Sequence, residues 1–119
     1  MFASFNYGDP VPAVSADLAN AIERDLVRIG DTYPVDIVGR LSGRGSWVDD
    51  DGTRYSEESG SVQVWADVAP DDAADLVQVF RDAAYRVARE HGQDGVAVVI
   101  GGGPLAYLGG VFGPGAGVA

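Results

Sequence analysis

The chain has 119 residues, a hydrophobic fraction of 46%, a charged fraction of 22% and a formal net charge of −10. This length allows one domain with a single modest core, and the composition is ordinary for a globular protein. The absence of cysteine excludes disulfides, thiolate catalysis and zinc–thiolate sites, and a single histidine makes a Ser-His-Asp triad hard to assemble within one subunit. The acidity disfavours direct nucleic-acid binding, which needs cationic surface. We expect neither a cofactor nor a metal ion.

The charges are distributed unevenly along the chain. All 8 cations are arginines, aspartates outnumber glutamates 14 to 4, and no charged residue follows position 94. Acidity of this kind is typical of a GC-rich genome or a salt-adapted host, and mimicry of nucleic acid is an alternative explanation. The N-terminus has neither a basic region nor a long apolar run, so no signal peptide is predicted and a cytoplasmic location is expected.

The first part of the chain predicts a strand, a helix and a second strand. Residues 2–7 suit a strand that a Gly-Asp-Pro sequence ends. Ser15 is a suitable N-cap for a helix to about Ile29, in which apolar residues recur at helical spacing. A strand over residues 35–41 is expected next, followed by a Gly/Ser-rich stretch whose glycines predict either a flexible connection or close backbone packing.

The second part predicts a hairpin, a long helix and a last strand. The sequence Asp49-Asp50-Asp51-Gly52 predicts a turn, and contiguous aspartates on an extended segment face alternate sides, which disfavours a calcium site. The return strand over residues 62–68 alternates apolar and polar positions. An apolar stripe predicts a helix over residues 70–90, with His91 supporting its C-terminal dipole, and a continuous apolar run predicts a strand over residues 96–100.

This order of elements is that of the ferredoxin-like split βαβ fold, an α+β class with two helices on one face of an antiparallel sheet. We predict one such domain over residues 1–100 and a Gly-rich apolar tail over residues 101–119. The first and third strands would be central, so residues 96–100 would form an apolar edge strand. Such edges invite pairing, and either the tail or a second subunit is expected to cover this one.

A protein contact surface is predicted at the charge-free C-terminus and at Trp65. Trp65 points away from the valines of its strand and hence lies on the open face of the sheet, where protein contact is favoured over a small ligand. Glycines and prolines interrupt the tail too often for a membrane span. We expect a homo-oligomer or a larger assembly. The predicted interface residues are Trp65, Val96, Val98, Ile100, Leu105, Tyr107, Leu108, Val111 and Phe112.

The hairpin and its return arm gather the residues that suit a small-molecule ligand. Glu58 has the parity of the core-facing valines, so its carboxylate needs a partner, for which Arg54, Arg40 and the Gln93 amide are candidates. Glu58 is then either a hydrogen-bonded structural acid or a ligand-binding acid. Adjacent Glu57 faces the other way, which makes the two a poor acid–base pair. The predicted ligand-binding residues are Trp47, Tyr55, Glu58 and Gln93, and no catalytic residue is assigned.

Residues 47–100 resemble an uncharacterised family of small bacterial proteins. The shared features are Trp47, the turn glycine Gly52, the pair Glu58-Ser59, and Gly92-Gln93-Asp94 before a valine-rich strand. The tail of this chain is longer and richer in glycine than the family pattern. The resemblance implies that Glu58 and Gln93 are neighbours, and it implies no activity.

Three functions are consistent with these observations, and no motif identifies a reaction. The first is a non-enzymatic acidic protein that acts through self-assembly or protein contacts, for which a viral or mobile-element origin would be suitable. The second is a protein that binds or sequesters a small molecule in a pocket between subunits. The third is a small hydrolase or lyase that uses Glu58, which the lack of a nucleophile–base pair disfavours.

Overall fold

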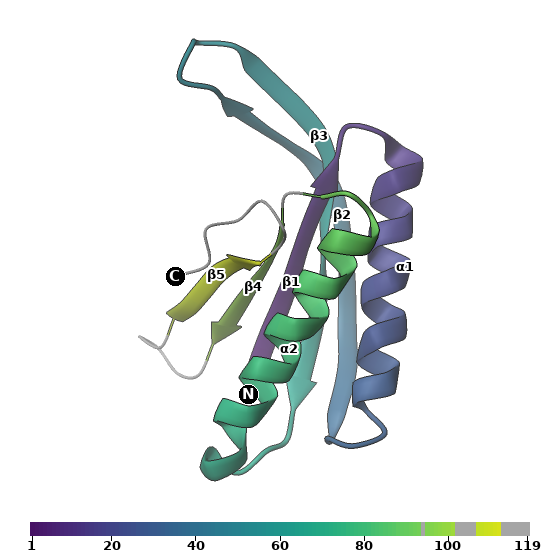
Figure 1. Ribbon diagram of the computed structural model, residues 1–119, viewed down its shortest axis with the longest axis vertical. Helices are drawn as coiled ribbons and strands as arrows, with labels where there is room; N and C mark the ends of the chain where they lie inside the picture. Colours follow the sequence, from purple (N-terminus) through teal and green to yellow (C-terminus); the bar gives the residue numbers. More distant parts are fainter. Residues whose placement is uncertain (94, 102–106, 113–119) are drawn as a thin grey trace.

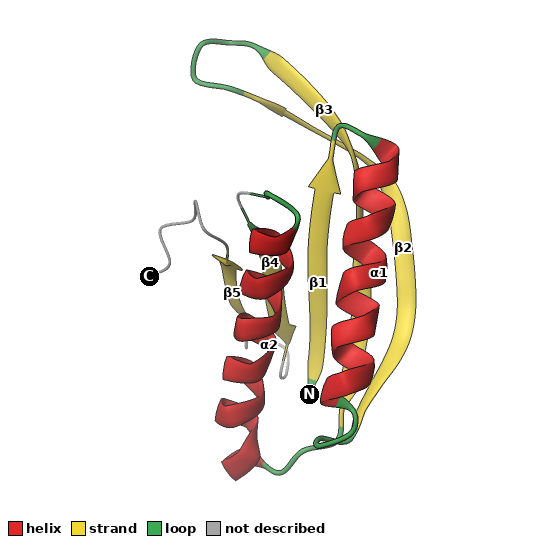
Figure 2. Cartoon of the chain, turned by 45° about the vertical axis from the view of Figure 1, so that its right-hand side comes forward, coloured by secondary structure: helices red, strands yellow, loops and turns green. Residues whose placement is uncertain are grey.

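A computed structural model describes residues 1–93, 95–101 and 107–112 of the chain. The elements are β1 (Phe2–Asp9), α1 (Pro12–Ile29), β2 (Val35–Val48), β3 (Arg54–Ala66), α2 (Pro70–Glu90), β4 (Val96–Gly101) and β5 (Tyr107–Phe112). The strands form one antiparallel sheet in the order β2-β3-β1-β4-β5, and both helices cover the same face of it (Figures 1 and 2). The predicted α+β class is confirmed, and the order of the first four strands is that of a ferredoxin-like fold with β1 and β3 central.

The core lies between the sheet and the two helices. Alternate residues of the central strands face it because successive side chains on a strand point to opposite faces. Phe5, Val62 and Val98 are buried there, as is Phe80 of the α2 stripe. The rings of Phe5 and Phe80 meet edge to face with their centroids 5.3 Å apart, so this aromatic pair joins β1 to α2 at the centre of the core.

Helix α1 begins one turn earlier than its sequence predicts. Its N-cap is Val11 and its first residue is Pro12, which is favoured there because a first-turn N–H has no partner within the helix. The Asp9 carboxylate accepts a hydrogen bond from the Val11 amide at 2.8 Å. Ser15 is therefore inside the helix, and its hydroxyl donates to the backbone oxygen of Glu58 at 3.1 Å, in place of the predicted capping role.

Strand β2 continues through the Gly/Ser-rich stretch, for which the sequence left open a flexible connection or close backbone packing. Cross-strand pairs run from Val35 opposite Ala66 to Val48 opposite Arg54, with one irregularity between Ile37 and Gly39. The flexible connection was the wrong alternative, because hydrogen bonds from β3 hold these glycines in the sheet and sequence propensity does not register such bonds. The return strand β3 begins at Arg54 and ends at Ala66.

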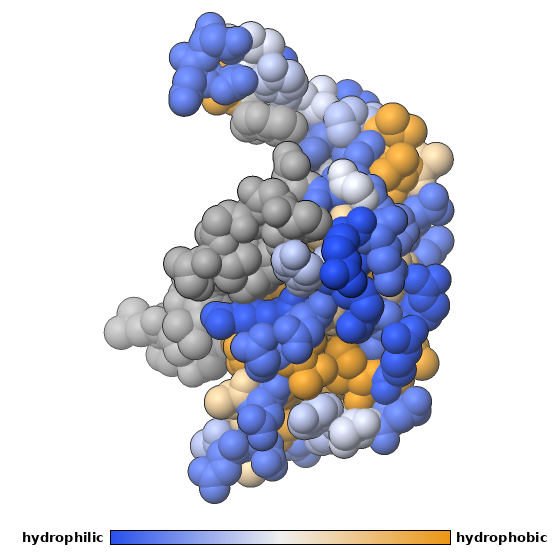
Figure 3. Space-filling view, viewed as in Figure 1, coloured by the Kyte–Doolittle hydropathy of each residue, from blue (hydrophilic) through white to orange (hydrophobic). Residues whose placement is uncertain are grey.

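The paired ends of β2 and β3 project beyond the body of the molecule as a long arm (Figures 1 and 2). The turn at its end is the predicted acidic one: the Asp49 and Thr53 backbones pair at 2.8 Å, and Gly52 has φ of 85°. A left-handed φ of this kind favours glycine. Hydrogen bonds from Thr53 lower the pKa of the Asp51 carboxyl. Figure 3 shows the end of the arm, at the top of the view, as a hydrophilic surface.

The glycine-rich tail contributes a fifth strand that the sequence does not predict as such. Strand β5 pairs antiparallel with β4, from Val96 opposite Phe112 to Gly101 opposite Tyr107. Of the two predicted ways to cover the β4 edge, the structure shows the folding back of the tail. Residues 107–112 therefore belong to the sheet, and β4 is an internal strand.

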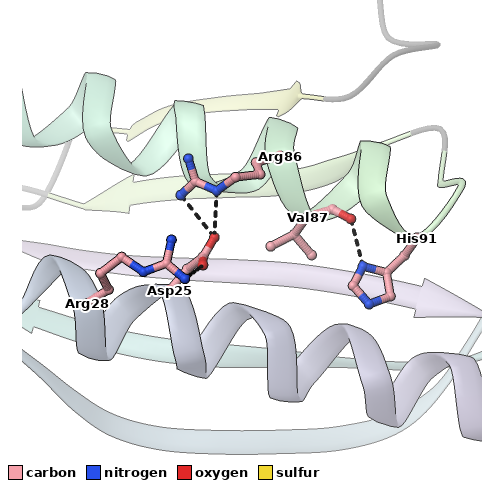
Figure 4. Close-up of polar contacts among 5 residues, drawn as sticks. All are labelled: Asp25, Arg28, Arg86, Val87 and His91. Atoms are coloured by element: carbon pink, nitrogen blue, oxygen red, sulfur yellow. Dashed lines mark hydrogen bonds and ion pairs between the residues drawn. The ribbon is translucent and has the colours of Figure 1, made fainter.

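A buried ion pair joins the two helices on the outer side of the core (Figure 4). The Asp25 side chain of α1 is 6% exposed, and Arg86 of α2 donates to its Oδ2 from Nε at 3.1 Å and from Nη2 at 3.0 Å. Arg28 lies 3.5 Å from the other carboxylate oxygen. The carboxylate thus contacts arginines from both helices, which compensates the cost of removing it from water.

His91 ends helix α2, as its position in the sequence predicts. Its Nδ1 lies 3.0 Å from the carbonyl oxygen of Val87 (Figure 4). A carbonyl oxygen only accepts hydrogen bonds, so Nδ1 carries the hydrogen. Gly92 follows with φ of 64°, and the chain turns there toward β4.

Candidate functional site

A groove lies on the open face of the sheet, where the arm leaves the body. Its volume is about 710 Å³, and its walls come from β1, β2, β3, β4 and the loop before β4. Four glycines line the groove: Gly8, Gly43, Gly60 and Gly95. Gly8 and Gly43 share the strand face of the groove, so the absence of side chains at these two positions hollows the sheet there. The polar side chains on its walls are those of Asn6, Ser42, Glu57, Ser59, Ser61 and Gln93.

Glu57 is the acidic group in this groove. Strand parity turns it to the open face, opposite in direction to Glu58. Its carboxyl group lies across the backbone of Gly8, so that a Cβ at Gly8 would be only 2.6 Å from Glu57 Cδ. Any residue other than glycine at position 8 would displace the Glu57 carboxylate. No described residue donates a hydrogen bond to this carboxylate or forms an ion pair with it.

Burial raises the pKa of the Glu57 carboxyl, and the nearby charge of Asp9 raises it further. An acid whose pKa is higher in the folded than in the unfolded chain binds its proton more tightly when folded. Glu57 therefore favours folding below its unfolded pKa, and this contribution is lost as the pH rises through its folded pKa. The groove therefore disfavours the ionised form of this carboxylate relative to water.

Asp9 links the end of β1 to the loop before β4. Its Oδ1 accepts from the Val11 amide at 2.8 Å, and its Oδ2 accepts from the Gln93 side-chain amide at 2.7 Å. Gln93 is one of the predicted ligand-binding residues, and it does lie on the wall of the groove. The Asp9–Gln93 contact joins residues 84 positions apart, so it fixes the two sides of the groove relative to each other.

Glu58 lies on the opposite, helix-covered face, as its parity predicts. Its carboxylate pairs with Arg44 of β2 at 2.8 Å. This partner corrects the predicted ones, since Arg44 is placed opposite Glu58 by the β2–β3 register within the Gly/Ser-rich stretch. Gln93 contacts Asp9, the cross-strand neighbour of Glu58, so Glu58 and Gln93 themselves do not hydrogen-bond.

The predicted ligand-binding set is therefore divided between three places. Gln93 lies at the open-face groove, Glu58 lies on the other face, and Tyr55 lies further along the arm with its side chain 41% exposed. Trp47 is opposite Tyr55 in the β2–β3 register. The sequence missed Glu57, Gly8 and Asp9, although the alternation of β3 places Glu57 on the same face as Trp65. Gly8 is opposite Ser59 in the β1–β3 register, so no local sequence pattern connects it with Glu57.

The predicted interface residues also occupy different environments. Trp65 is 50% exposed on the open face, where it is paired with Phe2 of β1 and Asp36 of β2. Val96, Val98 and Ile100 are buried in the core under the helices, so their side chains serve the core and not the predicted interface. Leu105 lies outside the described residues. The remaining four predicted interface residues belong to strand β5, of which only the backbone is described: Tyr107, Leu108, Val111 and Phe112.

Within residues 1–93, 95–101 and 107–112, no group of three or more His, Cys, Asp or Glu side chains is arranged to hold a metal ion. The consecutive aspartates 49–51 form the turn described above. Neither α1 nor α2 combines the length and the apolar character that a membrane-spanning helix needs.

No protein-family model and no curated protein matches the chain, which is consistent with its resemblance to an uncharacterised family. Among solved structures, the chain is similar to a phage SAM lyase in complex with S-methyl-5'-thioadenosine. The TM-score is 0.57 at 17% sequence identity, and the match covers 92% of this chain and 88% of that chain. At this identity the likeness establishes a shared fold over nearly the whole of both chains.

Proposed function

We propose that this chain binds S-adenosylmethionine in the open-face groove and cleaves it to S-methyl-5'-thioadenosine. The observation that carries this proposal is the Glu57 carboxylate, which lies in the groove with no cationic partner among the described residues. The fold shared with a phage SAM lyase supports it. The proposal replaces Glu58, the acid favoured by the sequence, with its neighbour on the other face of the strand.

The electrostatics of the groove suit a cationic ligand. S-adenosylmethionine carries a sulfonium, which an anionic site attracts, whereas the thioether product is neutral at sulfur. The Asp9 carboxylate lies beside Glu57, and its described hydrogen bonds come from uncharged groups. The net charge of −10 adds a long-range field that concentrates cations at the surface.

The size and polarity of the groove suit a nucleoside. A volume of about 710 Å³ lies within the range of ~300–1,000 Å³ for small-molecule sites. Asn6, Ser59 and Ser61 provide amide and hydroxyl groups along its floor. The glycine positions allow a flat base or a ribose to approach the strand backbones closely.

The proposed cleavage does not require a nucleophilic side chain from the protein. When the bond between sulfur and the amino-acid side chain breaks, its electron pair stays on sulfur and gives a neutral thioether. The four-carbon fragment either closes on its own carboxylate oxygen as that bond breaks, which needs no added reactant, or loses a neighbouring proton, which passes to water or to the Glu57 carboxylate. Orientation of the ligand in a partly dehydrated groove is the main requirement. This fits a chain without cysteine whose one histidine ends a helix.

Release of S-methyl-5'-thioadenosine from S-adenosylmethionine tests the proposal directly. The wild-type protein is expected to release it, as measured by liquid chromatography, and Glu57→Gln is expected to lower the rate at least ~100-fold, as loss of an electrostatic contact in an active site does. Burial raises the pKa of Glu57 and so makes its ionised form less favourable in the folded chain than in the unfolded chain. The variant, which has no such charge, should therefore be at least as stable as the wild type. Glu90→Gln, at the exposed end of α2, is the charge-matched control and should keep full activity.

Two outcomes would contradict the proposal. If the wild-type protein releases no S-methyl-5'-thioadenosine above the spontaneous rate, the activity is wrong. If Glu58→Gln is inactive while Glu57→Gln is active, the site lies on the helix-covered face and the groove is not where cleavage occurs.

Self-assembly through the open face is a second proposal, carried by Trp65. A half-exposed tryptophan on the open face of a sheet is typical of a protein contact, and it lies on the same face as the groove. Trp65→Ser is expected to lower the native mass measured by native mass spectrometry. Tyr85→Ser, which removes an exposed aromatic side chain from α2, should keep the wild-type mass. An unchanged mass in the Trp65 variant would remove this face as the contact.

A further inference from the structure

A second, smaller cavity lies on the helix-covered side of the sheet. It has a volume of about 140 Å³ and is formed between the first turns of α1 and strands β1, β2 and β3. Its walls include Tyr7, Ser15, Arg40, Ser42 and Glu58. It shares the lining residues Tyr7, Ser42 and Ser59 with the open-face groove, whereas Glu57 lines only the groove and Glu58 lines only this cavity. Its volume equals the liquid volume of about four to five water molecules.

Tyr7 is a buried side chain whose polar end is without a described partner. It is 7% exposed, and its ring reaches across Gly60, where a Cβ would be 2.8 Å from Tyr7 Cζ. Its hydroxyl forms no hydrogen bond with a described residue. No fully enclosed side-chain N or O in the described part lacks a partner, so this hydroxyl must reach accessible surface, and Tyr7 lines both this cavity and the open-face groove. Buried tyrosine hydroxyls usually have a partner.

The charges around the cavity favour an anion. Arg40 Nη1 lies 3.3 Å from Asn20 and 3.5 Å from Glu23, and its remaining donors have no acceptor among the described residues. The carboxylate of Glu58 is paired with Arg44 at 2.8 Å. The first turn of α1 carries no acidic residue, although the Asp9 carboxylate just before the helix accepts from the Val11 amide and compensates part of the helix dipole. The cavity is therefore a donor-rich position in an acidic protein.

We propose that this cavity binds a small monocarboxylate between the Arg40 guanidinium and the Tyr7 hydroxyl. The two oxygens of a carboxylate match the planar donors of a guanidinium, and the Tyr7 hydroxyl adds a third donor from the wall. The small volume restricts the ligand to a few non-hydrogen atoms. A phosphate dianion would meet the Glu58 carboxylate at close range, so a single negative charge fits better.

Titration with acetate, followed by amide shifts of Ser15 and Ala16 in NMR spectra, tests this site, because these two residues line this cavity and not the open-face groove. Acetate is expected to bind saturably to the full chain, and acetamide, its uncharged counterpart, at least ~10-fold more weakly. Tyr7→Phe removes one hydrogen bond and keeps the ring, and Arg40→Gln removes the guanidinium. Each is expected to weaken acetate binding about 10-fold, the equivalent of one hydrogen bond to a charged group. Arg24→Gln, on the exposed side of α1, removes the same charge and should bind acetate like the wild type.

Several results would overturn the proposal. They are the absence of saturable acetate shifts, equal binding of acetate and acetamide, or retention of full affinity by both Tyr7→Phe and Arg40→Gln. Tighter binding of inorganic phosphate than of acetate would also contradict the assignment to a monocarboxylate. Backbone spectra of each variant report whether it is folded, and Arg40→Lys, which keeps the charge, provides a second variant if Arg40→Gln is not. The result is independent of the release of S-methyl-5'-thioadenosine, which concerns the other face of the sheet.

Discussion

Phe80→Ala is expected to lower the free energy of unfolding by about 4 kcal/mol, the typical cost of truncating a phenylalanine in a packed core. Phe80 is fully buried, and its ring meets that of Phe5 edge to face. The substitution removes the apolar transfer energy of the ring, leaves a cavity between α2 and β1, and ends the aromatic contact. Because whole domains are stable by only ~5–15 kcal/mol, chemical denaturation should show a much lower midpoint.

Tyr85→Ala is the matched control for this experiment, because it truncates an aromatic residue on the exposed side of the same helix. Its ring lies under the Arg89 guanidinium, 5.7 Å from it, so a loss of less than about 1 kcal/mol is expected. Equal effects of the two substitutions would show that Phe80 does not occupy the core position described here.

Arg86→Met is expected to lower the free energy of unfolding by about 3 kcal/mol, near the lower limit for breaking a buried ion pair. The methionine keeps most of the apolar stem, but Asp25 then stays buried with only Arg28 at 3.5 Å. The lower limit is appropriate because the Arg86 side chain is itself 37% exposed. Equilibrium denaturation at neutral pH measures the change.

A double substitution separates loss of the pair from the cost of an unpaired charge. Asp25→Leu with Arg86→Met removes both partners, and it should recover most of the stability that Arg86→Met loses, because well-packed apolar residues can replace a buried ion pair. If the double variant is as unstable as the single one, packing of the Arg86 stem and not the buried carboxylate accounts for the loss.

The position of the candidate site could be predicted from the sequence only in part. The alternation of β3 places Glu57 and Trp65 on the open face and Glu58 on the covered one, and the structure confirms this parity. The choice of Glu58 as the ligand-binding acid rested on its need for a partner. That need is met by Arg44, whose position depends on the pairing of two strands in the arm.

The site also depends on contacts between distant parts of the chain. Asp9 and Gln93 are 84 positions apart and meet because β1 pairs with β4. Gly8 accommodates the Glu57 side chain because β1 also pairs with β3. Neither Gly8 nor Asp9 belongs to a local sequence pattern that indicates a site. Only the register of the sheet reveals how these two residues lie relative to Glu57.

The sequence by itself determined the elements whose period is strong: the helix over Pro70–Glu90, the alternating face of β3, and the acidic turn at Gly52. These follow from local periodicity and turn chemistry. The tertiary structure decided the extension of β2 through its glycines and the pairing of the tail as β5 with β4. The reason is that the hydrogen bonds holding those segments come from strands elsewhere in the chain, which no local propensity can encode.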